Sequence, residues 1–277
     1  MITVETAACT CVCASCGSLS SQTGMARCSM KLRLDKLVLE RGLAPSRERA
    51  QALILAGRVL VNEQKVEKPG TSIATDASLR VLGKDLRYVS RGGLKLERAL
   101  EHWKIDLHKK VCLDIGASTG GFTDCMLQHG ATKVIAGDTG YGQVDARLRQ
   151  DPRVILLEKT NARYLTTELL PSKADFVAMD VSFISATLVI SPVLAALRAK
   201  SEQEDIEAVV LVKPQFEAGR EAIGKGGIVR DEKAQLAALQ RVKQTVIQLG
   251  GSEIEAIDSP ILGAGGNREF LLHSRFT

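Results

Sequence analysis

The sequence has 277 residues, of which 45% are apolar and 25% charged, a balance that excludes wholesale disorder and predicts about two domains. Aromatic residues make up only 4%, which argues against broad platforms on which nucleic-acid bases could stack. The net charge of +5 is placed unevenly: residues 31–98 carry 15 Lys and Arg against 8 Asp and Glu. Such an excess is typical of nucleic-acid contact, although a solvated basic face has the same charge pattern.

Residues 1–30 form a Cys-rich leader that contains five of the seven cysteines. These cysteines have no second ligand pair at zinc-finger distance and no nearby His, so no metal site is expected. The segment lacks the charged start and long apolar run of a secretory signal, and it is poor in Arg for a transit peptide. We interpret it as a disordered leader, or as translation upstream of a true start at Met25 or Met30. The rest of the chain is typical of a cytoplasmic protein.

The block 31–83 predicts two helices followed by short strands. Apolar residues at helical spacing begin at Leu34, and the first helix ends at Gly42. Ser46 is the expected N-cap of the second helix, which Gly57 ends. Strand-like pieces follow at 58–61 and 78–82. The arginines expected to lie off the apolar stripes, and to contact RNA phosphates, are Arg33, Arg41, Arg47, Arg49 and Arg58.

The stretch RLDKLVLERGLAPSRERAQALILAGRVLVN resembles the small RNA-binding module first described in ribosomal protein S-four. The resemblance implies binding of structured RNA by a small α+β domain. The sequence departs from that pattern at Glu63, where the module usually places Gly after Asn62. A type I′ turn requires positive φ at this position, so a different hairpin geometry is expected here.

The second block alternates strands and helices, which predicts a parallel sheet covered on both faces. Strands are expected at 111–115, 133–137, 154–157, 175–179 and 208–212, and helices at 121–129, 144–149, 185–200 and 231–249. The last two strands, at 253–257 and 268–275, have no helix between them. The last strand is therefore antiparallel, which is typical of a Rossmann-like seven-stranded methyltransferase sheet.

A glycine-rich turn follows the first strand of this block, in the sequence LDIGASTGGF. Glycines there bring the backbone close to a ligand at a helix N-terminus, and Asp138 closes the second strand, where an acid can accept both ribose hydroxyls. Three rival motifs are weaker. Ser118 stands where a dinucleotide fingerprint needs Gly, and a hydrolase elbow would depend on His273, which lies in a predicted strand. Gly226 replaces the Ser or Thr of a phosphate loop.

Four charged residues lie at strand ends or on the helix before the sheet. Asp180 and Lys213 each follow an apolar strand, Glu269 begins the final strand, and Lys95 lies on a helix introduced by SRGG. Because carboxyl ends of parallel strands share an edge with the start of an antiparallel strand, these side chains should converge beside the glycine turn. The alternative is separate salt bridges at each strand end.

These residues resemble the Lys-Asp-Lys-Glu set of the FtsJ-like RNA 2′-O-methyltransferases. With the preceding RNA module, the motifs SRGGLKL, LDIGASTGGFTD, AGDTGYGQ, MDVSFIS, LVKPQFE and GNREF resemble the TlyA family, ribosomal RNA methyltransferases often labelled hemolysins. The resemblance implies that Lys95, Asp180, Lys213 and Glu269 carry catalysis. It also implies an S-adenosylmethionine site formed by Asp114, Gly116, Ser118, Gly120, Gly121, Asp138, Asn161 and Asp180.

The sequence thus predicts a cytoplasmic S-adenosylmethionine-dependent enzyme that methylates a ribose 2′-hydroxyl of ribosomal RNA, with cytidine as the target implied by the family and no metal required. The expected domains are a leader at 1–30, an RNA-binding domain at 31–83, a linker with the start of the catalytic helix at 84–98, and a methyltransferase domain at 99–277. Naked RNA and assembled subunits both remain open as substrates. Alternatives are a non-catalytic ribosome-assembly factor and a membrane-active hemolysin, although Asp180 and Pro192 interrupt the best candidate span.

Overall fold

The computed structural model describes residues 30–44, 46–82, 87–200 and 205–276. The chain divides between Lys84 and Asp85 into two compact units. Residues 1–29 of the predicted leader lie outside the described residues. The segment 84–98, predicted as a linker with the start of a helix, belongs to the second unit from Asp85 onward.

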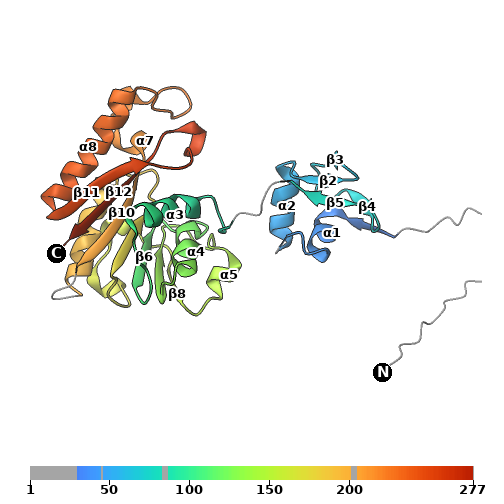
Figure 1. Cartoon of the computed structure of the whole chain (residues 1–277), viewed down its shortest axis with the longest axis horizontal. Helices are drawn as coiled ribbons and strands as arrows, with labels where there is room; N and C mark the ends of the chain where they lie inside the picture. Colours follow the sequence, from blue (N-terminus) through green and yellow to red (C-terminus); the bar gives the residue numbers. More distant parts are fainter. Residues whose placement is uncertain (1–29, 45, 83–86, 201–204, 277) are drawn as a thin grey trace, which may run out of the picture. The chain divides into compact units, whose positions relative to one another are not determined.

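The first unit is a small α+β domain with two short sheets (Figure 1). Its elements are β1 (Lys31–Arg33), α1 (Leu34–Glu40), α2 (Arg47–Leu55), β2 (Val59–Val61), β3 (Gln64–Lys65), β4 (Ser72–Ala74) and β5 (Leu79–Val81). The strand orders are β3-β2-β5 and β1-β4. Both predicted helices and two of the strands, β2 and β5, are present. The strands β1, β3 and β4 were not predicted, because KLR, QK and SIA each contain at most one large apolar residue, whereas VLV and LRV contain two or more.

Local sequence explains the ends of these helices. The Ser46 side chain accepts a hydrogen bond from the Arg49 backbone N–H at 3.2 Å and caps α2. Gly42 and Gly57 follow the two helices with φ of +66° and +63°, the left-handed conformation that glycine adopts without strain. The apolar stripes of α1 and α2 pack into one core with β2.

The hairpin between β2 and β3 uses the geometry that the sequence led us not to expect. Asn62 and Glu63 both have positive φ, 48° and 64°, and they form a two-residue loop between the paired residues Val61 and Gln64. These values are those of a type I′ turn without the usual glycine. The Glu63 carboxylate pairs with Arg80, and the Asn62 side chain accepts from the Ser78 backbone N–H at 2.9 Å, so tertiary contacts hold the turn.

Two of the predicted RNA-contacting arginines have an internal partner. Asp35 is fully buried, and its carboxylate accepts hydrogen bonds from Arg33 Nε at 3.1 Å, Arg47 Nε at 2.9 Å and Gln51 Nε2 at 2.9 Å. The guanidinium of Arg33 holds the pKa of the Asp35 carboxyl well below its usual range. The side chains of Arg33 and Arg47 remain 50% and 42% exposed, so they can face a ligand, and both also stabilise the fold through Asp35.

Replacing Asp35 by Asn is expected to lower the free energy of unfolding of the first unit by about 2 kcal/mol at pH 7, because two arginines lose a buried anionic partner. A folded-state pKa below the unfolded value makes this contribution complete above about pH 5 and lost progressively as the pH falls below about 4. Hydrogen exchange of residues 31–82, measured at pH 7 and at about pH 2, would show the difference between variant and wild type shrinking at the lower pH. Glu40→Gln, which removes an exposed charge from α1, is the control and should change exchange at neither pH.

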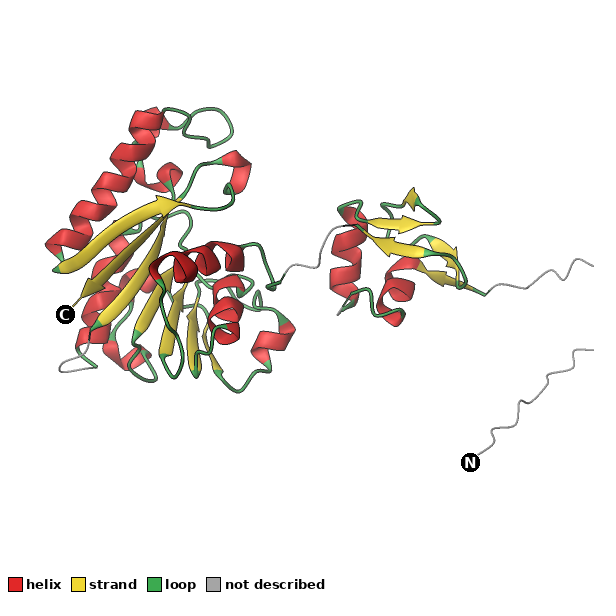
Figure 2. Ribbon diagram, viewed as in Figure 1, coloured by secondary structure: helices red, strands yellow, loops and turns green. Residues whose placement is uncertain are grey.

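The second unit contains a seven-stranded sheet with the order β11-β12-β10-β9-β6-β7-β8 (Figure 2). Its elements are α3 (Gly92–Trp103), β6 (Val111–Ile115), α4 (Gly121–Gln128), β7 (Lys133–Gly137), α5 (Ala146–Arg149), β8 (Val154–Leu157), η1 (Ala162–Tyr164), η2 (Thr167–Leu169), β9 (Phe176–Met179), α6 (Thr187–Arg198), β10 (Ile206–Val212), α7 (Pro214–Glu217), η3 (Arg220–Ala222), α8 (Glu232–Gln248), β11 (Gly251–Asp258), η4 (Ala264–Gly266) and β12 (Phe270–Phe276). The predicted strands and helices are confirmed, with ends that differ by two residues or fewer.

Helices cover both faces of the sheet, so each buried strand is apolar on both sides. Val210 and Val212 of β10 face one core with α6 and α8, whereas Val209 and Leu211 face the other core with α3 and α4. The predicted antiparallel last strand is confirmed, because β12 lies between β10 and β11 and runs antiparallel to both. No helix among the described residues is long and apolar enough to cross a membrane.

Candidate active site

The glycine turn lies where β6 ends, at the carboxyl edge of the sheet. Gly116 has φ of +88°, and a Cβ there would lie 2.4 Å from the backbone oxygen of Asp180, so this position admits only glycine. The Asp138 carboxylate accepts hydrogen bonds from the backbone N–H groups of Ser118 at 2.8 Å and Gly140 at 2.7 Å. Asp138 therefore fixes the turn after β6 to the loop after β7.

A cavity of about 390 Å³ opens beside this turn. Its lining includes Gly116, Ser118, Asp138, Asn161 and Asp180 of the predicted cofactor site. Asn161 also caps η1, because its side-chain oxygen accepts from the Arg163 backbone N–H at 3.1 Å. The structure thus places five of the predicted cofactor-site residues around this one cavity.

Asp114 and Gly120, also predicted to contact the cofactor, lie behind the cavity wall. The Asp114 side chain is fully buried in β6, and it accepts a hydrogen bond from the Thr123 hydroxyl at 2.6 Å. Burial, with the nearby charges of Asp180 and Asp138, raises the pKa of Asp114 to about 7. Gly120 has φ of +94° and starts α4, where a Cβ would lie 2.3 Å from the Leu148 side chain. Both residues shape the turn from within the fold.

Lys213 and Asp180 form the first of two ion pairs at this edge. Lys213 follows β10, and its Nζ lies 2.5 Å from Asp180 Oδ1 and donates a hydrogen bond to Ser182 Oγ at 2.7 Å. The side chains of Lys213 and Asp180 are 10% and 22% exposed. Because Asp180 and Ser182 line the larger cavity, the amine of Lys213 lies directly behind its wall.

Lys95 and Glu269 form the second pair, from residues 174 positions apart in the chain. Lys95 Nζ donates to Glu269 Oε2 at 2.5 Å, and the side chains are 11% and 2% exposed. Glu269 immediately precedes β12, whereas the sequence predicted that it begins this strand. A Cβ on Gly263 would lie 1.9 Å from Glu269 Oε1, so the loop before β12 closes over this carboxylate.

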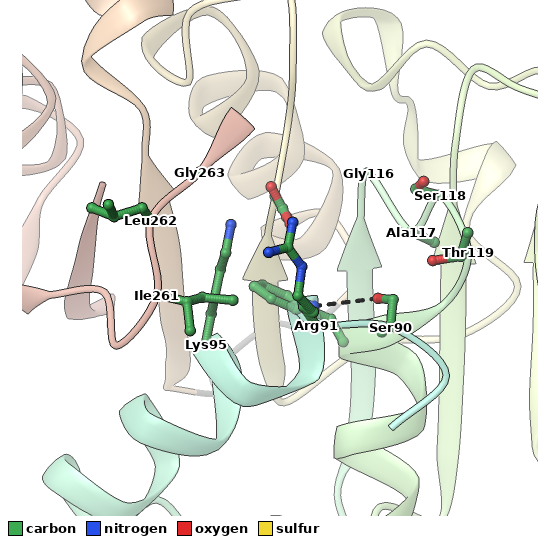
Figure 3. Close-up of a pocket in the computed structure, with 14 residues that line it drawn as sticks. Ser90, Arg91, Lys95, Gly116, Ala117, Ser118, Thr119, Ile261, Leu262 and Gly263 are labelled. Carbon is green, nitrogen blue, oxygen red and sulfur yellow. Dashed lines mark hydrogen bonds between the residues drawn. The ribbon is translucent and has the colours of Figure 1, made fainter. Parts of the chain in front are cut away.

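A second cavity, of about 280 Å³, connects the two pairs. It is lined by Lys95, Asp180, Gly116, Ser118 and Gly121, among others, and so shares three residues with the larger cavity. The Lys95 amine and the Arg91 guanidinium both extend from the start of α3 into the space between the 116–119 turn and the 261–263 loop (Figure 3). The four charged residues predicted to converge therefore lie in or behind the wall of one pair of adjoining cavities.

Sequence reasoning missed three residues at this site. Arg91 lines the smaller cavity, although the SRGG motif that contains it was noticed only as a helix start. Phe183 lines the larger cavity and is 93% exposed, with φ of +63°. Glu217 is buried beside the loop that carries Phe183. The motifs MDVSFIS and LVKPQFE contain the last two, but spacing alone gave them no role.

The rival chemistries find no support in this geometry. His273, the histidine that a hydrolase elbow would require, is buried and lies 3.1 Å from Glu207 Oε1, near the start of β10 and far along that strand from Lys213. Within the described ranges, no group of three His, Cys, Asp or Glu side chains could hold a metal ion.

The sheet order with one reversed strand, the glycine turn after β6 and the acid after β7 define the Rossmann-like methyltransferase class. Comparison with known families makes this assignment more specific. The chain belongs to the FtsJ-like methyltransferase family, which matches residues 88–276, and an S4 domain matches residues 32–78.

Individual relatives match nearly the whole chain. The protein YqxC of Bacillus subtilis, whose name assigns it to the rRNA methyltransferases, is 49% identical over 246 residues, covering 88% of this chain and 86% of that protein. The 16S/23S rRNA (cytidine-2′-O)-methyltransferase TlyA of Mycobacterium tuberculosis is 42% identical, covering 88% of this chain and 90% of the relative. A solved structure of a Streptococcus thermophilus protein named a hemolysin superposes with a TM-score of 0.68 at 43% identity, covering 90% of each chain.

Proposed function

We propose that this protein is a cytoplasmic S-adenosylmethionine-dependent methyltransferase that modifies the ribose 2′-hydroxyl of a cytidine in ribosomal RNA. The observation that carries the proposal is the placement of two lysine–carboxylate pairs, Lys213–Asp180 and Lys95–Glu269, at two cavities that share the glycine turn. The names of the relatives at 42–49% identity support the substrate and the target atom.

The residues of the larger cavity fit the proposed cofactor. Asp138 and Asn161 offer hydrogen-bonding groups for a nucleoside, and the missing Cβ of Gly116 lets the Asp180 backbone pack against the turn that lines the cavity. When bound, S-adenosylmethionine supplies a methyl group that is already electrophilic on its sulfonium. The side chains of this chain then need only to bind, align and deprotonate the ribose hydroxyl.

We assign proton handling at the ribose 2′-oxygen to Lys213. Its Nζ is held behind the cavity wall by Asp180 and Ser182, which both line the larger cavity. Lys95, which Glu269 fixes from behind, contributes a positive charge where negative charge develops on that oxygen. With both amines protonated, the two carboxylates keep the buried set neutral. To accept the hydroxyl proton, Lys213 must first lose its own proton, and it returns to the ammonium form as the oxygen–methyl bond forms.

We assign the grip on structured RNA to the first unit. Residues 1–84 contain none of the three Tyr, six Phe or one Trp of the chain, so this unit has no ring on which a base could stack. Its proposed contacts are the phosphate-binding side chains Arg33, Arg41, Arg47, Arg49 and Arg58. Exposed Phe183, at the lip of the cofactor cavity, offers the catalytic unit a ring for a base drawn out of its stack.

The proposal is tested by methyl transfer from isotope-labelled S-adenosylmethionine to ribosomal subunits and to naked rRNA, followed by mapping of ribose methylation. We expect label at a cytidine 2′-oxygen. A ribosome-assembly factor without turnover would bind the RNA and transfer no label, and a product methylated on a base would contradict the assignment of the acceptor atom.

Replacing Gly116 by Ala is expected to weaken cofactor binding by at least about tenfold, because φ of +88° is strained for alanine and the new Cβ would collide with the Asp180 backbone. Calorimetric titration with S-adenosylhomocysteine measures this directly. Gly142→Ala is the matched control: Gly142 also has positive φ, at +71°, but no atom lies within 4 Å of its Cβ position. Equal losses in the two variants would mean that backbone strain, and not contact with Asp180, explains the effect.

A further inference from the structure

Two loops at the carboxyl edge of the sheet are tied together by a residue without a role in the chemistry above. One loop, residues 181–186, follows β9 and the reactive Asp180, and the other, residues 213–217, begins with Lys213 and forms α7. At one end they meet through the Lys213 contacts to Asp180 and Ser182. At the other end they meet through Glu217.

The Glu217 carboxylate uses both of its oxygens on the 181–186 loop. Oε2 accepts a hydrogen bond from the Ser185 hydroxyl at 2.5 Å, and Oε1 accepts from the Ala186 backbone N–H at 2.7 Å. Ala186 is the N-cap of α6 and has no side chain with which to cap the helix. Glu217 binds the N–H of this N-cap from a different element, and its negative charge favours the helix N-terminus, while the Ser185 hydroxyl oxygen accepts from the Thr187 N–H at 3.2 Å.

Because the Glu217 carboxylate is buried, the loss of its hydrogen bonds to Ser185 and Ala186 would be costly. Glu217 is only 3% exposed, and burial raises the pKa of its carboxyl, whereas the hydrogen bonds from Ser185 and Ala186 oppose that shift. Arg241 of α8 donates a hydrogen bond to the Glu217 backbone oxygen and so anchors α7 from the other side. A buried carboxylate with these partners is costly to leave unpaired, so it restricts how far the loops can separate.

Phe183 lies in the loop between the Lys213 contacts and the Glu217 contacts, and its backbone conformation requires support from surrounding residues. Its φ of +63° is strained for a bulky residue, and its ring lies 5.3 Å from the ring of Phe216 in the facing loop. Strained backbone persists where surrounding contacts determine it, and here hydrogen bonds at Ser182, Ser185 and Ala186 flank the residue.

We infer that Glu217 is a positioning residue for the reaction: by clasping the loop after β9 to the segment after β10, it sets the geometry of Lys213 and Asp180 at the cavity. This inference rests on the proposed function. Lys213 and Glu217 are the two ends of one four-residue α7 and its N-cap, so release of Glu217 lets the Lys213 amine shift relative to Asp180. A displacement of about 1 Å between reacting groups can cost up to about 100-fold in rate.

The test compares the full-length variants Glu217→Gln, Ser185→Ala and the double variant with the full-length wild-type protein. Glutamine keeps the size of the side chain but has one acceptor oxygen in place of two. We expect kcat for methyl transfer to rRNA to fall by on the order of tenfold in Glu217→Gln, with smaller changes in the RNA KM and the cofactor Kd. The loss in the double variant should be smaller than the product of the two single losses, because both changes break the Ser185–Glu217 hydrogen bond. Glu101→Gln, which removes an exposed charge from α3, should leave kcat unchanged.

Hydrogen exchange provides a readout that does not depend on turnover. Glu217→Gln should raise exchange at residues 182–187 and 213–218 and leave β6, β7 and the first unit unchanged. Unchanged exchange there, or raised exchange with unchanged kcat, would overturn the inference. If the wild-type protein transfers no methyl group, the proposed function fails on its own, and with it the catalytic role of the clasp, while exchange still reports whether Glu217 joins the loops.

Discussion

Lys213→Ala is expected to lower methyl transfer to rRNA by about 10²–10⁴-fold, because it removes the amine assigned to proton handling at the ribose 2′-oxygen. Cofactor binding should persist, since Lys213 lies behind the cavity wall and contacts it through Asp180 and Ser182. Labelled-methyl transfer measures the first effect, and calorimetric titration with S-adenosylhomocysteine measures the second.

Stability separates this result from a folding defect. Asp180 is 22% exposed, so after loss of Lys213 its charge still has access to water, and the variant should remain folded. The control is Lys233→Ala, which removes an exposed lysine from α8 and should preserve full activity. Full activity in Lys213→Ala would remove this residue from the mechanism.

The parts of the fold that were predictable are those with continuous apolar runs between turn signals. The bounds of β6, β7 and β8 agree with the predicted ranges because these short, mostly apolar segments are followed directly by Gly116, Asp138 and Glu158. The convergence of Asp180, Lys213 and Glu269 was also predictable, since strand direction alone places their backbone positions at one edge.

Contacts that depend on how elements approach one another were not predictable. Asp35 has the spacing of an ordinary helix N-terminal acid, yet tertiary packing buries it beneath Arg33 and Arg47. Similarly, the role of Glu217 follows from its distance to Ser185 across two loops, a quantity that no periodicity encodes. The turn at Glu63 shows the same limit, because its partner Arg80 lies 17 residues away in the chain.

The distribution of aromatic residues implies that the two units contribute differently to RNA recognition. The first unit, with no aromatic ring, is restricted to charge and shape when it binds RNA, so its contribution to affinity should fall steeply with salt. The rings of the catalytic unit include three that are mostly exposed, Tyr141, Tyr164 and Phe183, and recognition of individual bases is assigned there.

Lys95→Met is expected to abolish activity and also to destabilise the second unit by about 3 kcal/mol, because it leaves the Glu269 carboxylate, whose side chain is only 2% exposed, without its partner. This loss of stability distinguishes the Lys95 pair from the more exposed Lys213 pair. Denaturant unfolding followed by the fluorescence of Trp103 reports it, since this is the chain's one tryptophan and lies at the end of the same helix, α3.

The double variant Lys95→Met, Glu269→Gln separates the two consequences. Neutralising the stranded carboxylate should recover most of the lost stability, since removal of both partners of a buried ion pair costs far less than removal of one. Methyl transfer should stay lost, because the Lys95 ammonium no longer faces the ribose oxygen and only the Arg91 guanidinium remains at the start of α3. Recovery of activity together with stability would mean that Lys95 acts only by holding the loop before β12 in place, and the catalytic set would then reduce to the pair of Lys213 and Asp180.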